Sequence, residues 1–163
     1  MHIASWRTTY AGLLPERVIA KRTDWETRRA LWAGRLSREC AVFVVEDGEG
    51  IAGLACASVM PERPQDYEPL PHFGAYLDAL YLLLDRQQRG FGRALLDALA
   101  RDLIARDITS MALHVLSTSP ARGFYERMGA TFVRDEPAYG EEYFSCAYGF
   151  ADLGVLVAAG TPV

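Results

Sequence analysis

The stretch Leu80–Leu103, LYLLLDRQQRGFGRALLDALARDL, constrains the fold more than any other part of this 163-residue chain. An apolar run leads through a short charged link to a pair of glycines one residue apart, and then to apolar residues at helical spacing. This order predicts a strand, a tight turn and a helix. Glycines at such a junction let the backbone close on a ligand, and the unpaired N–H groups of a helix's first turn bind anions. We therefore predict a phosphate-binding unit here.

Two familiar phosphate-binding motifs do not fit this stretch. A dinucleotide fingerprint needs G-x-G-x-x-G, but Leu95 stands where the last glycine should be. Nothing in the chain resembles the nucleotide motif G-x-x-x-x-G-K-[ST]. What remains is QQRGFG (Gln87–Gly92), whose consecutive amides suit a diphosphate, with Gln87, Arg89 and Arg93 as donors at its rim.

The remaining segments predict a mixed sheet built around this unit. We expect a helix from residue 2 with a break before Pro15, a second helix over 23–40, and a hairpin over 40–61 that turns at Asp47–Gly50. Further strands are expected at 75–84, 110–116 and 131–150, and a short helix at 119–129. In the helix over 23–40, the buried stripe is expected to contain Trp25, Leu31 (or Trp32) and Leu36. The order places a β-α-β unit at the centre of one domain spanning 1–163.

Composition excludes several classes of protein. The net charge is −4 with no block of basic residues, which disfavours a nucleic-acid groove. No apolar run approaches the roughly 18 residues of a membrane span. The odd number of cysteines (Cys40, Cys56 and Cys146) and the lack of C-x-x-C spacing argue against a disulfide framework or a zinc site. We expect a reduced, cytoplasmic protein.

The segment ALYLLLDRQQRGFGRALL (Ala79–Leu96) resembles the coenzyme A loop of the GNAT superfamily of N-acetyltransferases, with its [RQ]-x-x-G-x-[GA] pattern at a helix start. TSPARGFYERMGAT (Thr118–Thr131) is similar to the family's second motif, with Ala121, Tyr125 and Gly129 at the family's spacing. The resemblance covers most of the chain. It implies a small bacterial member with an α/β fold: a mixed, mostly antiparallel central sheet, a central parallel β-α-β unit and flanking helices.

The resemblance also implies a direct acetyl transfer from acetyl-CoA to an amine, without a metal. Tyr125 would protonate the departing sulfur, and the backbone N–H of Leu82 would hold the oxyanion. The strand edge at Leu80–Leu82 would pair with the pantetheine arm, and the amides of Gln87–Gly92 would take the pyrophosphate. The residues implied to bind the cosubstrate are Leu80, Tyr81, Leu82, Gln87, Gln88, Arg89, Gly90, Phe91, Gly92, Arg93, Thr118 and Tyr125.

The sequence departs from the family pattern at three places. Tyr76 stands where many relatives carry a glutamate; strand alternation puts Asp78 on the same face as Tyr76, Leu80 and Leu82, either acting through water or as a solvated strand-end carboxylate. We assign no base. Thr118 replaces the usual asparagine. The chain also begins inside the first helix, so either an edge strand is absent or the true start lies upstream.

The acceptor is expected to be a primary amine of a small molecule. The acidic run of Asp135, Glu136, Glu141 and Glu142 is either a solvated loop or, if it lines the site, a feature that favours cationic acceptors such as polyamines or amino sugars. His114 is expected to be a packed or hydrogen-bonded core residue. Two alternatives stay open: a non-catalytic acyl-CoA sensor, and a protein or peptide amine acetylase. Homodimers are common among relatives, and no residue demonstrates one.

Overall fold

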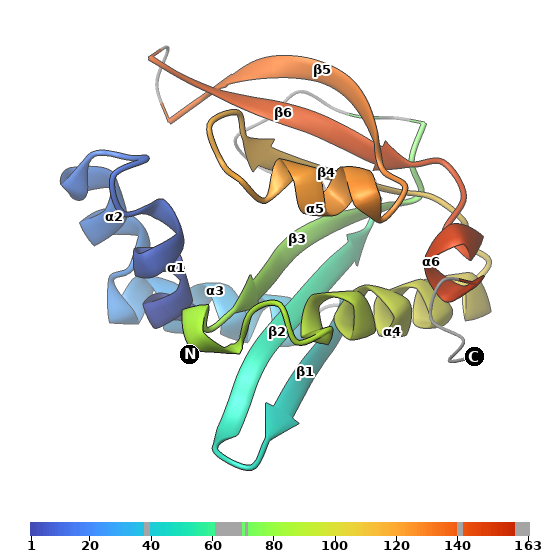
Figure 1. Cartoon of the computed structure of the whole chain (residues 1–163), viewed down its shortest axis with the longest axis horizontal. Helices are drawn as coiled ribbons and strands as arrows, with labels where there is room; N and C mark the ends of the chain where they lie inside the picture. Colours follow the sequence, from blue (N-terminus) through green and yellow to red (C-terminus); the bar gives the residue numbers. More distant parts are fainter. Residues whose placement is uncertain (38–39, 61–69, 71, 140–141, 159–163) are drawn as a thin grey trace.

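A computed structural model describes residues 1–37, 40–60, 70, 72–139 and 142–158. Six strands form one sheet in the order β1-β2-β3-β4-β6-β5, and this order can be followed in Figure 1. The strands are β1 (Ala41–Asp47), β2 (Gly50–Val59), β3 (Ala75–Leu82), β4 (Met111–Leu116), β5 (Thr131–Ala138) and β6 (Tyr143–Phe150). Neighbouring strands are antiparallel except for β3 and β4, which are parallel and are connected through α4 (Phe91–Ala105). The mixed, mostly antiparallel sheet with a central β-α-β unit is thus confirmed.

Helices cover both faces of the sheet. On one face, the α4 face, α4 packs its apolar stripe of Leu95, Leu96, Leu99 and Leu103 on the strands, and α5 (Arg122–Arg127) and α6 (Gly154–Ala158) lie beside it. On the other, the α1–α3 face, lie α1 (His2–Tyr10), α2 (Glu16–Arg22) and α3 (Trp25–Leu36). There Trp6, Leu14 and Ile19 pack against Leu116 of β4. The sequence reasoning did not predict α6.

The parallel pair β3–β4 separates after its first residues. Pairing joins Ala75 to Met111 and Tyr76 to Ala112, and the register extends no further between these two described strands. Beyond this point β3 continues to Leu82 alongside β2 alone. We call the resulting gap the fork; Figure 1 shows β3 and β4 diverging along it. The fork leaves one backbone edge of β3 open in the middle of the sheet.

A β-bulge at Asp78 changes which residues of β3 share a face. Ala57 of β2 is opposite Leu77 and Cys56 is opposite Ala79, so Asp78 is an extra residue on β3. The expected alternation is therefore wrong: Tyr76 lies on the α1–α3 face, while Leu80 and Leu82 pack against the core under α4. Asp78 reaches Arg35 of α3, which puts it on the α1–α3 face with Tyr76.

The predicted buried stripe of α3 is also wrong. Trp25 and Leu36 are 66% and 67% exposed, and Leu31 is exposed as well. Asp24 caps the helix by accepting a hydrogen bond from the Thr27 backbone N–H. Arg35 stacks on the ring of Trp32, and that face of the helix is turned to the protein. The helix therefore docks through arginine and tryptophan rather than through an aliphatic stripe.

The far end of α4 closes with a left-handed turn. The Ile108 N–H donates to the Leu103 carbonyl (2.9 Å) and the Asp107 N–H to the Ile104 carbonyl (3.0 Å), the two bonds of a Schellman motif. Asp107 takes the position that requires positive φ, at +60°. Ile108 packs on the main core, as expected for the residue that follows such a turn.

Candidate active site

The amino-terminal end of α4 presents unpaired amides. Gly90 is its N-cap residue with φ +83°, no side chain caps the helix, and its first turn has no acidic residue. The first intrahelical bond runs from the Ala94 N–H to the Gly90 carbonyl, so the amides of residues 91–93 have no partner within the helix. Gln88 also has positive φ, +60°. The amide of Gln87, predicted as part of the phosphate site, instead donates to the Leu84 carbonyl at 3.3 Å.

The two glycines of this loop have different physical roles. Around Gly90 no atom lies within 4 Å of a hypothetical Cβ, so glycine serves its left-handed backbone conformation. At Gly92 a Cβ would lie 3.2 Å from the Phe124 ring and 3.6 Å from Leu82, so glycine lets α4 begin close against α5 and β3. Leu95 is buried on the helix's inner face, which explains why no glycine stands there.

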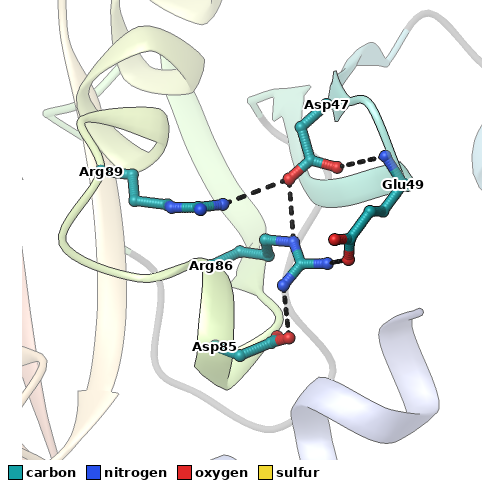
Figure 2. Close-up of polar contacts among 5 residues, drawn as sticks. All are labelled: Asp47, Glu49, Asp85, Arg86 and Arg89. Carbon is teal, nitrogen blue, oxygen red and sulfur yellow. Dashed lines mark hydrogen bonds and ion pairs between the residues drawn. The ribbon is translucent and has the colours of Figure 1, made fainter.

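An ionic cluster holds the turn before this loop to the tip of the β1–β2 hairpin (Figure 2). Arg86, whose side chain is only 13% exposed, donates from Nε to Asp47 at 2.8 Å and also pairs with Asp85 and Glu49. Arg89, predicted at the rim of the phosphate site, reaches the same Asp47 carboxylate at 3.3 Å. The cluster therefore anchors the 3₁₀ turn Leu84–Arg86 through Asp85 and Arg86, and the phosphate loop through Arg89.

The open edge of β3 exposes alternate backbone groups to the fork. The Leu83 N–H donates to the Ala52 carbonyl of β2 at 2.9 Å, and N–H groups in an extended strand alternate between its two edges. The backbone groups of Tyr81 therefore face β2, whereas those of Leu80 and Leu82 face the fork. Of the three residues predicted to pair with a pantetheine arm, Leu80 and Leu82 have their main-chain donors in the required direction.

Tyr125 contributes a phenol to the same region. Its side chain comes from α5, is 8% exposed and packs edge-on against Phe124. Burial raises the pKa of this phenol well above its usual value, and the nearby Tyr81 raises it further. The hydroxyl makes no hydrogen bond with any residue that the structure describes. Tyr125 is thus a protonated donor whose hydroxyl has no acceptor among the described residues.

Aromatic residues of α1 and β3 close one end of the fork. The hydroxyls of Tyr10 and Tyr81 lie 3.5 Å apart, and Trp6 stacks on Tyr10. His2 packs on Tyr81 and accepts a hydrogen bond on Nδ1 from Trp32 Nε1 (2.8 Å). Burial, followed by nearby positive charges, lowers the pKa of His2 to about 3, so this imidazole is neutral at neutral pH. Of these residues, the sequence analysis assigned only Tyr81 to the site, through the strand edge Leu80–Leu82.

A polar belt crosses the α1–α3 face at the level of the fork. It consists of Ser58 on β2, Asp78 on β3, His114 on β4 and Glu136 on β5, and it lies between the apolar clusters around Tyr76 and around Trp6. Asp78 accepts a hydrogen bond from Ser58 and pairs with Arg35 at 3.4 Å, with its side chain 17% exposed. The expectation of a solvated Asp78 carboxylate is therefore wrong.

His114 joins three strands within this belt. Its Nδ1 lies 2.9 Å from the Tyr76 hydroxyl, and its Nε2 lies 3.4 Å from Glu136 Oε1, with only 2% of the His114 side chain exposed. Arg134 pairs with Glu136 at 2.6 Å. Burial lowers the pKa of His114, Glu136 acts in the opposite direction, and Arg134 lowers it again. The predicted hydrogen-bonded core histidine is confirmed.

The remaining predicted site residues differ in how far they are exposed to solvent. Thr118 and Arg93 are exposed, and Phe91 is half-buried. In the acidic run, Asp135 accepts a hydrogen bond from Cys146 Sγ at 3.0 Å, Glu136 belongs to the polar belt, and Glu142 is exposed. Glu141 lies outside the described residues, as do residues 61–69.

Two of the cysteines lie in strands of the sheet, Cys56 in β2 and Cys146 in β6. Cys56 and Cys146 are buried free thiols whose pKa burial raises, to about 12 and about 11. Within the described ranges, no three His, Cys, Asp or Glu side chains gather in a way that could hold a metal ion. In the same ranges, every helix is too short or too polar to cross a membrane.

Comparison with known proteins identifies the family of the chain. The model of the acetyltransferase (GNAT) family matches residues 5–130. The chain is 28% identical over 159 residues to the uncharacterized N-acetyltransferase YuaI of Bacillus subtilis, covering 96% of this chain and 87% of the relative.

Solved structures agree with this assignment at the level of the fold. A GNAT-family acetyltransferase from Desulfovibrio desulfuricans matches with a TM-score of 0.65 and 18% identity over 93% of this chain and 91% of the other. PaiA N-acetyltransferase from Thermoplasma acidophilum, solved in complex with coenzyme A, matches with a TM-score of 0.64 and 18% identity over 91% and 87%. The chain therefore belongs to the acetyltransferase (GNAT) family of acyltransferase enzymes.

Proposed function

We propose that this enzyme transfers the acetyl group of acetyl-CoA directly to a primary amine of a small molecule. The observation that carries the proposal is the fork, where a strand edge, the start of α4 and the Tyr125 phenol meet. The amides at the start of α4 suit a pyrophosphate, because they are unpaired and no acidic side chain opposes an anion there. The family match and the coenzyme A complex of the PaiA relative support the same cosubstrate.

The fork also supplies the groups that acyl transfer needs. The backbone N–H of Leu82, and that of Leu80 with the same direction, would donate to the oxyanion that forms when the amine attacks the thioester carbonyl. Tyr125 would then hydrogen-bond to the departing thiolate and pass its proton to the sulfur. Burial keeps this phenol protonated, so it is a donor throughout the neutral pH range.

Thiol release from acetyl-CoA, measured against a panel of small amines, tests the proposal. The panel includes a polyamine, an amino sugar and a peptide with a free amino terminus. We expect Tyr125→Phe to lower kcat about 100-fold while the unfolding midpoint stays unchanged, because the hydroxyl makes no hydrogen bond to the part of the chain that the structure describes.

Tyr148→Phe is the matched control. The Tyr148 hydroxyl donates to Glu126 at 2.5 Å and accepts from Arg122 at 3.1 Å, both on α5, the helix that carries Tyr125. Its loss should therefore lower stability, whereas kcat should fall far less than in Tyr125→Phe. Full activity of Tyr125→Phe would remove the assigned acid. Tight binding of coenzyme A without turnover on any amine would favour a sensor, and turnover on the peptide alone would favour a peptide acetylase.

The cytoplasmic location and a homodimer stay predictions.

A further inference from the structure

We propose that Tyr76, His114 and Glu136 form a proton relay that accepts the proton of the attacking amine. The inference rests on the proposed acetyl transfer, which leaves this proton without an acceptor. Tyr76 is the last residue of β3 that pairs with β4, so its side chain stands where the fork opens. An acceptor that approaches a thioester held in the fork therefore approaches the Tyr76 hydroxyl.

The contacts of His114 define the direction of the relay. Glu136 faces Nε2, and a carboxylate attracts the imidazole proton to the nitrogen that it faces. Nδ1 then carries the lone pair and accepts the Tyr76 O–H at 2.9 Å. A phenol that donates its proton keeps oxygen lone pairs as acceptors.

The transfer balances in three steps that occur together. As the amine nitrogen bonds to the carbonyl carbon, its N–H proton passes to Tyr76 Oη, and the Tyr76 proton passes to His114 Nδ1. The imidazole becomes an imidazolium, whose charge the Glu136 carboxylate offsets. His114 starts neutral, because burial lowers its pKa.

The neighbouring carboxylate is less suited to this role. Asp78 is the bulge residue of β3, and Arg35 already binds one of its carboxylate oxygens while the Ser58 hydroxyl binds the other. Arg134 pairs with Glu136 Oε1, the oxygen that also faces His114 Nε2, so Glu136 acts through the imidazole as a positioning residue. The charged and titratable groups described around the His114 ring are Tyr76 from β3 and Glu136 and Arg134 from β5.

The pKa of the acceptor amine separates a proton relay from a merely structural histidine. We compare a simple alkylamine, which is mostly protonated at neutral pH, with its fluorinated analogue, which is mostly neutral. His114→Gln should lower kcat/KM for the alkylamine about 100-fold, and for the fluorinated amine by less than a tenth of that factor. Tyr76→Phe should show the same contrast, and raising the pH should restore much of the alkylamine activity in both variants.

Asp135→Asn is the control, since Asp135 precedes Glu136 on β5 but contacts Cys146 on the other face; it should leave both amines unaffected. Equal losses with the two amines, or no loss, would overturn the relay alone. No turnover by the unaltered chain with any amine would overturn the proposed function and the relay together.

A second readout does not depend on activity. Imidazole nitrogen NMR of the full chain should show His114 neutral at neutral pH, with its proton on Nε2. A proton on Nδ1, or titration like that of a free histidine, would overturn the relay.

Discussion

Replacing Asp107 with glycine should stabilise the protein. The residue is exposed, has φ +60° and follows the last turn of α4, and its side chain makes no ion pair or hydrogen bond with the described residues. Left-handed backbone costs a non-glycine residue about 1–2 kcal/mol, and glycine's freedom in the unfolded chain offsets about 0.4–1 kcal/mol of the gain. A carboxylate at a helix carboxyl end adds an unfavourable ~0.3–1 kcal/mol. The sum is a gain of about 1 kcal/mol.

Urea unfolding at low and high salt separates these two contributions. Asp107→Asn tolerates the left-handed turn and loses only the charge, so it should gain about 0.3–1 kcal/mol, and salt should diminish that gain. Asp107→Gly should gain more, and in a thermal scan its unfolding temperature should rise by roughly 2–4 °C. Acetyl transfer should not change, since the fork lies at the other end of a 15-residue helix. A less stable Asp107→Gly protein would refute the reasoning.

Three further outcomes follow from contacts already described. The pKa of His2 is about 3 in the folded chain against 6.5 ordinarily, so between these pH values the unfolded chain binds a proton that the folded chain does not. The free energy of unfolding should therefore be highest above about pH 6.5 and fall below it by up to ~1.4 kcal/mol per pH unit. In urea titrations at several pH values, His2→Gln should flatten that slope. An unchanged slope would contradict a neutral His2. Gly53→Ala should cost about 1–3 kcal/mol of stability and reduce acetyl transfer, because a Cβ there would lie 2.9 Å from the Tyr81 carbonyl and overlap Leu82. A Cβ at Gly48 meets no atom within 4 Å, so Gly48→Ala should change neither property. Equal effects of the two variants in unfolding and thiol-release assays would count against the packing argument. Arg86→Gln should weaken coenzyme A binding by calorimetry more than Arg101→Gln does, because Arg86 centres the cluster of Figure 2 and Arg101 forms an exposed pair with Asp97; equal affinities would separate the cluster from the phosphate loop.

Periodicity and turn residues predicted the sheet and the start of α4 well, because these depend on local signals. The Asp47–Gly50 turn joins β1 and β2 as predicted, and Leu95 lies on the buried face of α4. The bulge at Asp78 left no local signal, since it depends on how β2 and β3 pair. Alternation alone therefore placed Leu80 and Leu82 on the wrong face.

Partners from distant elements decided what the sequence could not show. The exposed Trp25 and Leu36 were expected to be buried because apolar spacing says nothing about which neighbour a helix meets. His114 was recognised as a core residue, but Tyr76 and Glu136 come to it from other strands. No spacing rule relates positions 76, 114 and 136.

The narrow parallel pairing also has a consequence for folding. Strands β1, β2 and β3 form one antiparallel half of the sheet and β4, β6 and β5 form the other, and among the described strands only two paired positions join the halves. Within each half the strands pair with one another, so we expect each half to assemble as a unit. A cosubstrate arm bound in the fork would then connect the two halves of the sheet. Ligand binding should make unfolding more cooperative, and hydrogen exchange should slow most along the facing edges of β3 and β4.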